Sequence, residues 1–141
     1  MDVRPLLVVD AANVVGAVPD GWWRRRAEAA ELLRDALEPV AANGLDVRGL
    51  PASLGRLARG PLDVVMVVEG AAARIGGTPA VRVVAARGGG DDAIVRLVAA
   101  EAPGRPVAVV TADRGLRGRV VALGAAVLGP SALPRRSRLP R

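Results

Sequence analysis

Four short Val-rich apolar runs, separated by helical patterns, constrain the fold of this chain more than any other feature. The runs are LLVVD (6–10), LDVVMVVEG (62–70), VRVVAA (81–86) and PVAVVTAD (106–113). A weaker run, AAVLG, follows at 125–129. None of them alternates regularly between apolar and polar residues, as a strand with one exposed face does. We therefore expect strands that are buried on both faces of a parallel sheet.

The intervening sequences carry helical periodicity, with apolar residues every three or four positions and Arg or Glu between them. The helices expected from it span 23–42, 91–102 and 113–124. Residues 43–61 are rich in Gly and Pro and predict an irregular connection with one short helical turn, ASLGRLA (52–58). Strands that alternate with helices are typical of an α/β fold with a parallel sheet and right-handed crossovers.

Length and composition are typical of one domain that does not enter a membrane. The 141 residues can enclose a core, and 51% of them are hydrophobic. No apolar run approaches the ~20 residues of a membrane-spanning helix. The first run carries Asp10 and is a poor signal peptide. We expect a cytoplasmic protein with no membrane partner.

The chain contains no His, Cys, Tyr or Lys. This excludes His-based triads, cysteine nucleophiles, Schiff bases, zinc sites with His or Cys ligands, and the lysine of a P-loop. Catalysis must use carboxylates, hydroxyls, Asn, Arg or a metal ion held by carboxylates. The net charge of +6 comes from arginine, which forms bidentate contacts with phosphate. Such a charge indicates either a polyanionic partner or a bias towards GC-rich codons.

Acidic residues stand where the expected strands end. These residues are Asp10, Glu69 and Asp113 at the ends of three runs, and Asp91 and Asp92 after the glycines that follow another. Parallel strands in an open sheet bring their carboxyl ends to one edge, where ligands bind. Carboxylates gathered there would repel one another unless a cation neutralised them. A Mg²⁺ or Mn²⁺ ion, bound by two or three carboxylates and water molecules, is the best joint explanation.

Each acidic residue also has a simpler interpretation on its own. Asp91 and Asp113 precede helical sequence, and Asp is one of the best residues for capping a helix N-terminus. Glu69 could be an ordinary solvated strand end. Asp10 is harder to explain as a cap, because residues 11–19 show no helical pattern.

Polar side chains near these acids are candidates for contacts with a phosphate group. Asn13 could bind a phosphate, orient Asp10 or simply form a turn, and Thr111 could hold a metal-bound water or satisfy the backbone. Arg114 begins a helix, where phosphate binding is favourable, and Arg87 precedes the glycines. The simpler interpretation of both arginines is a solvated surface charge.

The two aromatic residues and the basic tail each have two interpretations. Trp22 and Trp23 could stack on bases, but adjacent side chains point in different directions, so at least one is expected to pack. Residues 131–141 form a basic tail that we expect to be flexible, the alternative being an arm that contacts phosphates. The folded domain is then expected to span 1–130.

Four motifs together resemble those of NYN-domain proteins. They are LLVVDAANVVG, VVMVVEG, GGGDDAIVRLV and VAVVTADRGLRG, and they extend the resemblance over residues 6–129. NYN domains are the bacterial branch of the PIN-like metal-dependent ribonuclease fold, and this chain is most similar to the YacP-like group. The resemblance implies a PIN-like three-layer sandwich, in which helices flank a mostly parallel sheet of four to five strands.

The resemblance also implies an activity, because the family binds a divalent ion through its acids and hydrolyses RNA phosphodiester bonds. A Mg²⁺- or Mn²⁺-dependent ribonuclease with RNA as its partner is therefore expected. Matched by position, the implied catalytic and metal-binding acids are Asp10, Asp91 and Asp113. Asp91 is preferred to Asp92 because it lies three residues before the aliphatic Ile94. Glu69 stands where an Asp is common, and with Asp92 it is an auxiliary ligand candidate.

The family pattern is not complete, and two other functions use the same acids. Ala12 replaces an aromatic residue often found before Asn13, and Gly115 stands where some relatives carry a second Asp. A non-catalytic module would keep the acids and bind RNA or a protein partner without turnover. Whether or not the chain is catalytic, a second copy of it and a regulatory protein are further candidate partners. A nucleotide phosphohydrolase would act with the same acids on free nucleotides.

Overall fold

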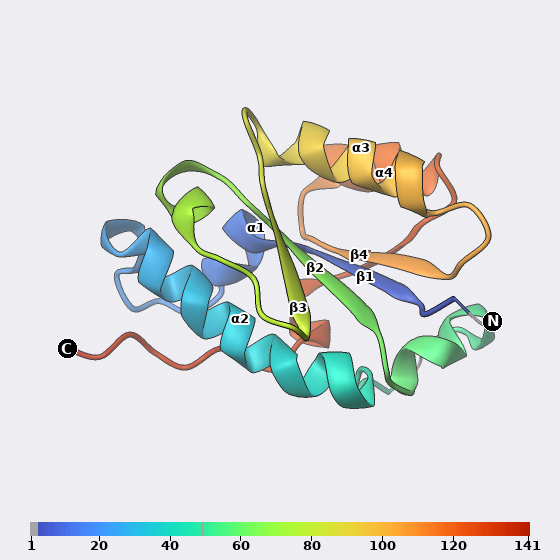
Figure 1. The fold of residues 1–141 in the computed structure, drawn as a ribbon, viewed down its shortest axis with the longest axis horizontal. Coiled ribbons are helices and arrows are strands. Elements are labelled where there is room, and N and C mark those ends of the chain that lie inside the picture. The colour runs from blue at the N-terminus through green and yellow to red at the C-terminus, as the bar shows by residue number, and fades with distance from the viewer. Residues whose placement is uncertain (1–2, 49) are drawn as a thin grey trace.

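A five-stranded parallel sheet forms the centre of the computed structural model, which describes residues 3–48 and 50–141 (Figure 1). Its strands are β1 (Leu6–Asp10), β2 (Asp63–Val68), β3 (Val81–Ala85), β4 (Val107–Val110) and β5 (Ala126–Leu128). They are ordered β3-β2-β1-β4-β5, and every neighbouring pair is parallel. The predicted α/β class with a mostly parallel sheet is confirmed, and the weak fifth run is a strand.

Helices cover both faces of this sheet (Figure 1). The α-helices of the described residues are α1 (Ala11–Val15), α2 (Arg26–Asn43), α3 (Gly90–Glu101) and α4 (Arg114–Val121). Helices α1 and α2 lie on one face, and α3 and α4 lie on the other. The result is the three-layer arrangement expected of a PIN-like fold. No helix in the described part of the chain is long and apolar enough to cross a membrane.

Alternating side chains of β1 divide the core between the two layers. Leu7 and Val9 pack on the α1 and α2 side, whereas Leu6 and Val8 pack on the α3 and α4 side. All four side chains are fully buried. Because both faces of the sheet are covered, its strands need no polar face, and this explains the continuous apolar runs.

Short 3₁₀ segments complete the connections. They are Trp22–Arg24, Ala52–Ala58, Gly70–Arg74 and Pro130–Ala132. The second is the helical turn predicted within the Gly- and Pro-rich connection. The first shortens the helix that was expected from residue 23, so that α2 begins at Arg26.

Helix α1 is a correction to the sequence prediction, because residues 11–19 were not expected to be helical. The chain turns into a helix directly after β1, and Val14 and Val15 are buried against the α2 layer. Packing of this kind, rather than periodicity, stabilises so short a helix. Asp10 is the N-cap residue of α1 by position, but its side chain makes no capping hydrogen bond.

Two residues of the C-terminal tail contact the rest of the domain, whereas the flexibility expected of the tail stays a prediction. Arg136 is buried and pairs with Asp20 at 2.8 Å, and it also donates to the carbonyl of Val15 at 3.0 Å. Asp20 further accepts the N–H of Leu139 at 2.9 Å. A buried arginine requires such partners, and here they fasten the tail to the end of α1. The domain boundary at residue 130 stays a prediction.

Candidate active site

Four carboxylates, which we call the acidic rim, lie near the carboxyl ends of the strands: Asp10, Glu69, Asp91 and Asp113. Asp10 is its most buried member, with 6% of the residue exposed. It forms no ion pair with any arginine of the described residues. Burial raises the pKa of Asp10, and the negative charges of Asp91 and Glu69 raise it further.

Thr111 and Asn13 tie the ends of β1 and β4 together. The Thr111 hydroxyl donates to Oδ2 of Asp10 at 2.8 Å, which opposes the rise in the pKa of that carboxyl. The same hydroxyl accepts the N–H of Asp113 at 3.1 Å, and Oδ1 of Asn13 accepts the N–H of Ala112 at 2.8 Å. Both side chains therefore have structural roles that also orient the acidic rim.

Asp113 caps helix α4, as its simpler interpretation predicted. Its Oδ1 accepts the N–H of Leu116 at 3.0 Å, at the start of the helix. Its charge also acts on Asp91, whose pKa it raises. The cap and a place in the acidic rim are therefore compatible.

Asp91 and Asp92 begin α3, but they have different surroundings. Burial raises the pKa of Asp91, and Asp113 and Glu69 raise it further. The Asp92 side chain is 64% exposed and pairs with Arg119 of α4 at 2.9 Å. Neither caps α3, because the N-cap residue is Gly89 and no side chain bonds there, so the capping interpretation of Asp91 is wrong. Asp92 belongs to a surface ion pair that the sequence did not predict.

Glu69 holds the start of α3 and is not a free strand end. Its Oε2 accepts the backbone N–H of Gly90, and the residue is half-buried. A Cβ atom at position 90 would lie 2.6 Å from that oxygen, so a larger residue there would require the Glu69 side chain to shift. The contact joins the end of β2 to the first residue of α3.

The two arginines predicted to bind phosphate lie exposed near the acidic rim. Arg114 is the first residue of α4, and Arg87 lies in the loop before α3. Neither forms a side-chain hydrogen bond or an ion pair with the residues that the structure describes. Both guanidinium groups are therefore accessible to a ligand.

The tryptophans follow the expectation that at least one of them packs. Trp22 is partly buried against the core, and Trp23 is 55% exposed. Their rings meet edge to face with centroids 6.1 Å apart, and the Arg26 guanidinium lies 5.4 Å from the Trp22 ring centroid. Trp22 is thus a packing residue, and Trp23 alone offers a free ring.

The arrangement of the acids limits how a metal could be held. Within residues 3–48 and 50–141, no three Asp or Glu side chains are close enough to hold one ion together. Backbone N–H groups engage Glu69 and Asp113, and an ion pair engages Asp92. Asp10 and Asp91 act on each other through charge, and neither carboxylate forms an ion pair with the described residues.

The fold is similar to that of two solved structures, while no protein-family model and no curated protein matches the sequence. Rae1 (YacP) from Bacillus subtilis superposes with a TM-score of 0.65 at 18% identity, over 94% of this chain and 71% of that one. A single-residue mutant of Rae1 gives a TM-score of 0.62 at 19% identity, over 91% and 71%. At this identity the comparison shows the fold alone: a YacP-like α/β fold.

Proposed function

We propose that this chain is a divalent-metal-dependent ribonuclease that hydrolyses RNA phosphodiester bonds at the acidic rim. The observation that carries the proposal is Asp10, a buried carboxylate that has no ion pair among the described residues and lies near Asp91 and Glu69. Burying a carboxylate beside other carboxylates costs free energy. Such arrangements concentrate at functional sites, where a bound cation or a reaction uses them.

Two similarities support the proposal from different directions. The motifs that carry Asp10, Asp91 and Asp113 resemble those of NYN-domain ribonucleases. The fold is similar to that of YacP, and the YacP-like group is the one that the motifs resemble most.

The donors of the acidic rim suit Mg²⁺ or Mn²⁺, which prefer oxygen ligands. Mg²⁺ commonly keeps several waters and uses only one or two carboxylates, so fewer than three close acids is compatible with binding. We assign direct contact to Asp10 and Asp91, and assign contact through water to Asp113, Glu69 and Asp92. Such an ion would lower the pKa of a bound water and stabilise charge on the phosphate.

Other residues of the chain would prepare and position this site. Thr111 keeps Asp10 oriented, and its hydrogen bond favours the ionised carboxylate. Asn13 fixes the loop between β4 and α4 through the N–H of Ala112. Arg114 and Arg87 would contact the RNA backbone, because accessible guanidinium groups bind phosphate bidentately.

The test is cleavage of a labelled single-stranded RNA in Mn²⁺ and in EDTA. We expect the wild-type chain to cleave in Mn²⁺ only, and Asp10→Asn to be inactive in both. Asp35→Asn is the matched control, because Asp35 is 66% exposed on α2. Cleavage that survives both EDTA and Asp10→Asn would contradict the proposal.

The same assay separates the two other candidate functions. RNA that binds but is never cleaved would favour a non-catalytic module. Release of phosphate from free nucleotides in preference to RNA cleavage would favour a nucleotide phosphohydrolase, because the metal chemistry is common to both.

A further inference from the structure

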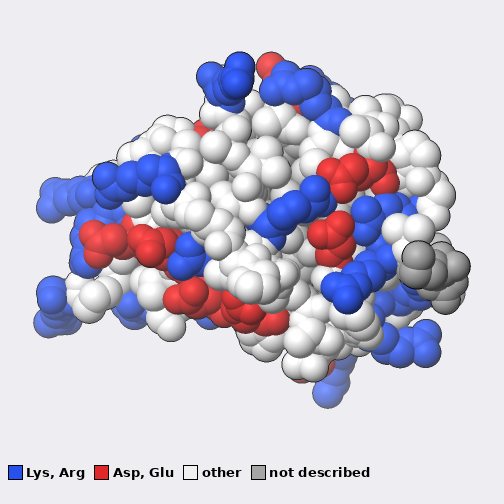
Figure 2. Space-filling model, in the orientation of Figure 1, with Lys and Arg blue, Asp and Glu red and all other residues white. Residues whose placement is uncertain are grey.

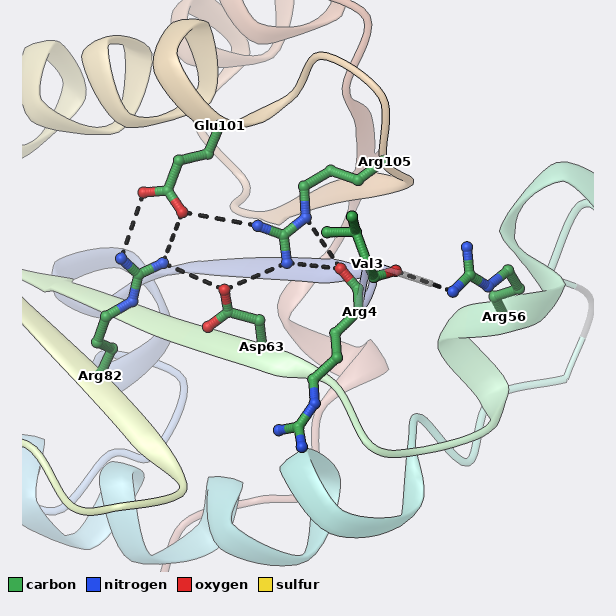
Figure 3. Close-up of polar contacts among 7 residues, drawn as sticks. All are labelled: Val3, Arg4, Arg56, Asp63, Arg82, Glu101 and Arg105. Carbon is green, nitrogen blue, oxygen red and sulfur yellow. Dashed lines mark hydrogen bonds and ion pairs between the residues drawn. The ribbon is translucent and has the colours of Figure 1, made fainter. Parts of the chain in front are cut away.

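At the opposite edge of the sheet, where the strands begin, some arginines are paired with acids and others have no ion pair among the described residues. The acids of this edge, Asp63 and Glu101, share the guanidinium of Arg82 at 3.3 and 2.7 Å (Figure 3). Arg105 lies 3.2 Å from Asp63 and 3.7 Å from Glu101. Two carboxylates and two arginines therefore neutralise one another in this network.

Three further arginines line a hollow beside the network. The lining residues of this arginine hollow are Arg4, Pro5, Arg56, Arg59, Gly60 and Pro61. No acid lines it, and none of its arginines forms an ion pair with the described residues. Figure 3 shows the Arg4 guanidinium directed away from Asp63. In the space-filling view, basic side chains lie at this end of the molecule as well as at the opposite end (Figure 2).

The arginines of the hollow keep most of their donors available. Arg56 donates one hydrogen bond, to the carbonyl of Val3 at 2.9 Å. Within the described residues, Arg4 is engaged only through its backbone carbonyl, which accepts from Arg105 at 2.9 Å. Because a guanidinium carries five N–H donors, the hollow presents a set of unused donors around a concave surface.

Packing fixes residues 52–61, which carry two of these arginines. Leu54 and Leu57 of this segment are buried in the core. Gly60 lies so close to the end of α2 that a Cβ atom there would collide with the carbonyl of Ala42. A scaffold that is already ordered lowers the entropy cost of binding a ligand.

We propose that the arginine hollow binds the phosphodiester backbone of RNA, as a second contact outside the acidic rim. This inference rests on RNA being the substrate of the proposed function. Converging guanidinium groups match phosphate oxygens in geometry and charge, and backbone contacts of this kind position a nucleic acid without reading its sequence. A second contact of this kind would make RNA longer than a few nucleotides the preferred substrate.

The position of the hollow predicts a dependence on RNA length. The hollow adjoins the starts of β1 and β2, whereas the acidic rim lies at their ends. The five residues of β1 extend over about 17 Å. At about 3.4 Å per stacked nucleotide, and with a path that must run around the covered sheet, one strand needs at least about five nucleotides to contact both places.

The test is equilibrium binding of a fluorescent single-stranded RNA of about 12 nucleotides, measured by anisotropy in EDTA over a range of salt. The site variant is Arg4→Gln/Arg56→Gln/Arg59→Gln. The control variant, Arg24→Gln/Arg74→Gln/Arg96→Gln, loses the same charge at exposed positions outside both the hollow and the basic tail. Each phosphate contact to single-stranded RNA contributes about 0.7 to the salt slope, so the site variant should lose about 2. The control should lose less than half of that.

Several outcomes would overturn the proposal. Equal slopes for the site and control variants would do so, as would a wild-type chain without affinity for RNA. Another such outcome is displacement of the RNA by inorganic phosphate at a concentration that only equals that of the RNA phosphate groups. That result would show that the hollow binds a free anion. If the triple variant does not fold, Arg59→Gln alone should lower the slope by about 0.7, and an unchanged slope would count against the hollow.

Failure of this inference is distinguishable from failure of the proposed ribonuclease activity. The binding assay contains no metal and measures no cleavage, so it reports on the hollow alone. In the cleavage assay, the site variant should show a higher KM for the long RNA and an unchanged rate with a trinucleotide, which is too short to reach both places. A loss of trinucleotide cleavage would contradict the assigned role.

Discussion

The hydroxyl of Thr111 donates a 2.8 Å hydrogen bond to Oδ2 of the buried Asp10, and thereby joins the ends of β4 and β1 in the middle of the sheet. This contact lowers the pKa of a carboxyl group that burial and two neighbouring acids raise. Protonation of Asp10 should therefore be sensitive to the residue at position 111.

Replacing Thr111 with Val should raise the pKa of Asp10 further, because the only side-chain donor that the described residues offer to that carboxylate is lost. The acidic limb of the pH profile for Mn²⁺-dependent cleavage should move to higher pH. The free energy of unfolding should fall by about 1–3 kcal/mol, which is the cost of leaving buried polar groups unpaired. Thr111→Ser, which keeps the hydroxyl, is the control, and an identical acidic limb in Thr111→Val would refute the prediction.

Replacing Asp10 with Asn should stabilise the metal-free protein at neutral pH. A carboxyl group whose pKa is raised in the folded state contributes stability below its unfolded value, near 3.8, and this contribution is lost as the pH rises through the folded value. The neutral amide of the Asp10→Asn variant would not suffer this loss. Thermal melting in EDTA should show a higher Tm for Asp10→Asn at pH 7 and a smaller difference near pH 3.5; a variant that melts lower at pH 7 would contradict the prediction.

Mn²⁺ should raise the Tm of the wild-type chain but not that of Asp10→Asn. At a concentration 100 times the Kd, a ligand that binds only the folded state adds about 2.7 kcal/mol. For a chain of this size that corresponds to roughly 5–10 °C. Asp35→Asn should respond like the wild type, and equal shifts in Asp10→Asn would place the ion elsewhere.

Replacing Arg136 with Met should destabilise the protein by about 3 kcal/mol, because Asp20 would remain buried without its partner. The hydrogen bonds from Arg136 hold the pKa of Asp20 well below its usual range, so this pair stabilises above pH 3.8 and loses its effect as the pH falls. The free energy of unfolding is measured by urea denaturation for Arg136→Met, for Asp20→Asn and for the double variant Asp20→Asn/Arg136→Met. The double variant should lose less of this free energy than the two single variants lose together. Additive losses would show that the pair is not coupled.

Two substitutions of Asp113 should separate its capping role from its charge. Asn also caps helices well, so Asp113→Asn should keep the stability of α4, whereas Asp113→Ala should lose about 1 kcal/mol. Under the proposed function both variants lose most of the RNA cleavage. Full cleavage by Asp113→Asn would show that Asp113 caps α4 and has no role in RNA cleavage.

The sequence predicts the strands because burial on both faces produces continuous apolar runs, and the main helices because one buried face repeats every three or four residues. It also predicts that Asp10, Asp91 and Asp113 meet at one edge, because parallel strands end together. Helix α1 could not be predicted, since Val14 and Val15 are buried by a packing partner and not by a repeating pattern.

Long-range polar contacts are the part that the sequence does not reveal. Glu69 and Gly90 are 21 positions apart, and nothing local indicates that a backbone N–H will meet that carboxylate. Arg136 and Asp20 are 116 positions apart, and a basic tail alone indicates a solvated segment. A lone pairing of this kind leaves no repeated signal along the chain, unlike an apolar face.

The central claim, that the acidic rim is a metal site for RNA hydrolysis, is tested most directly by a crystal structure of the chain with Mn²⁺, using anomalous scattering to locate the ion. We predict an anomalous peak in contact with carboxylate oxygens of Asp10 and Asp91, and the loss of that peak in Asp10→Asn. An acidic rim without a peak at saturating Mn²⁺, or a peak that persists in Asp10→Asn, would contradict the claim.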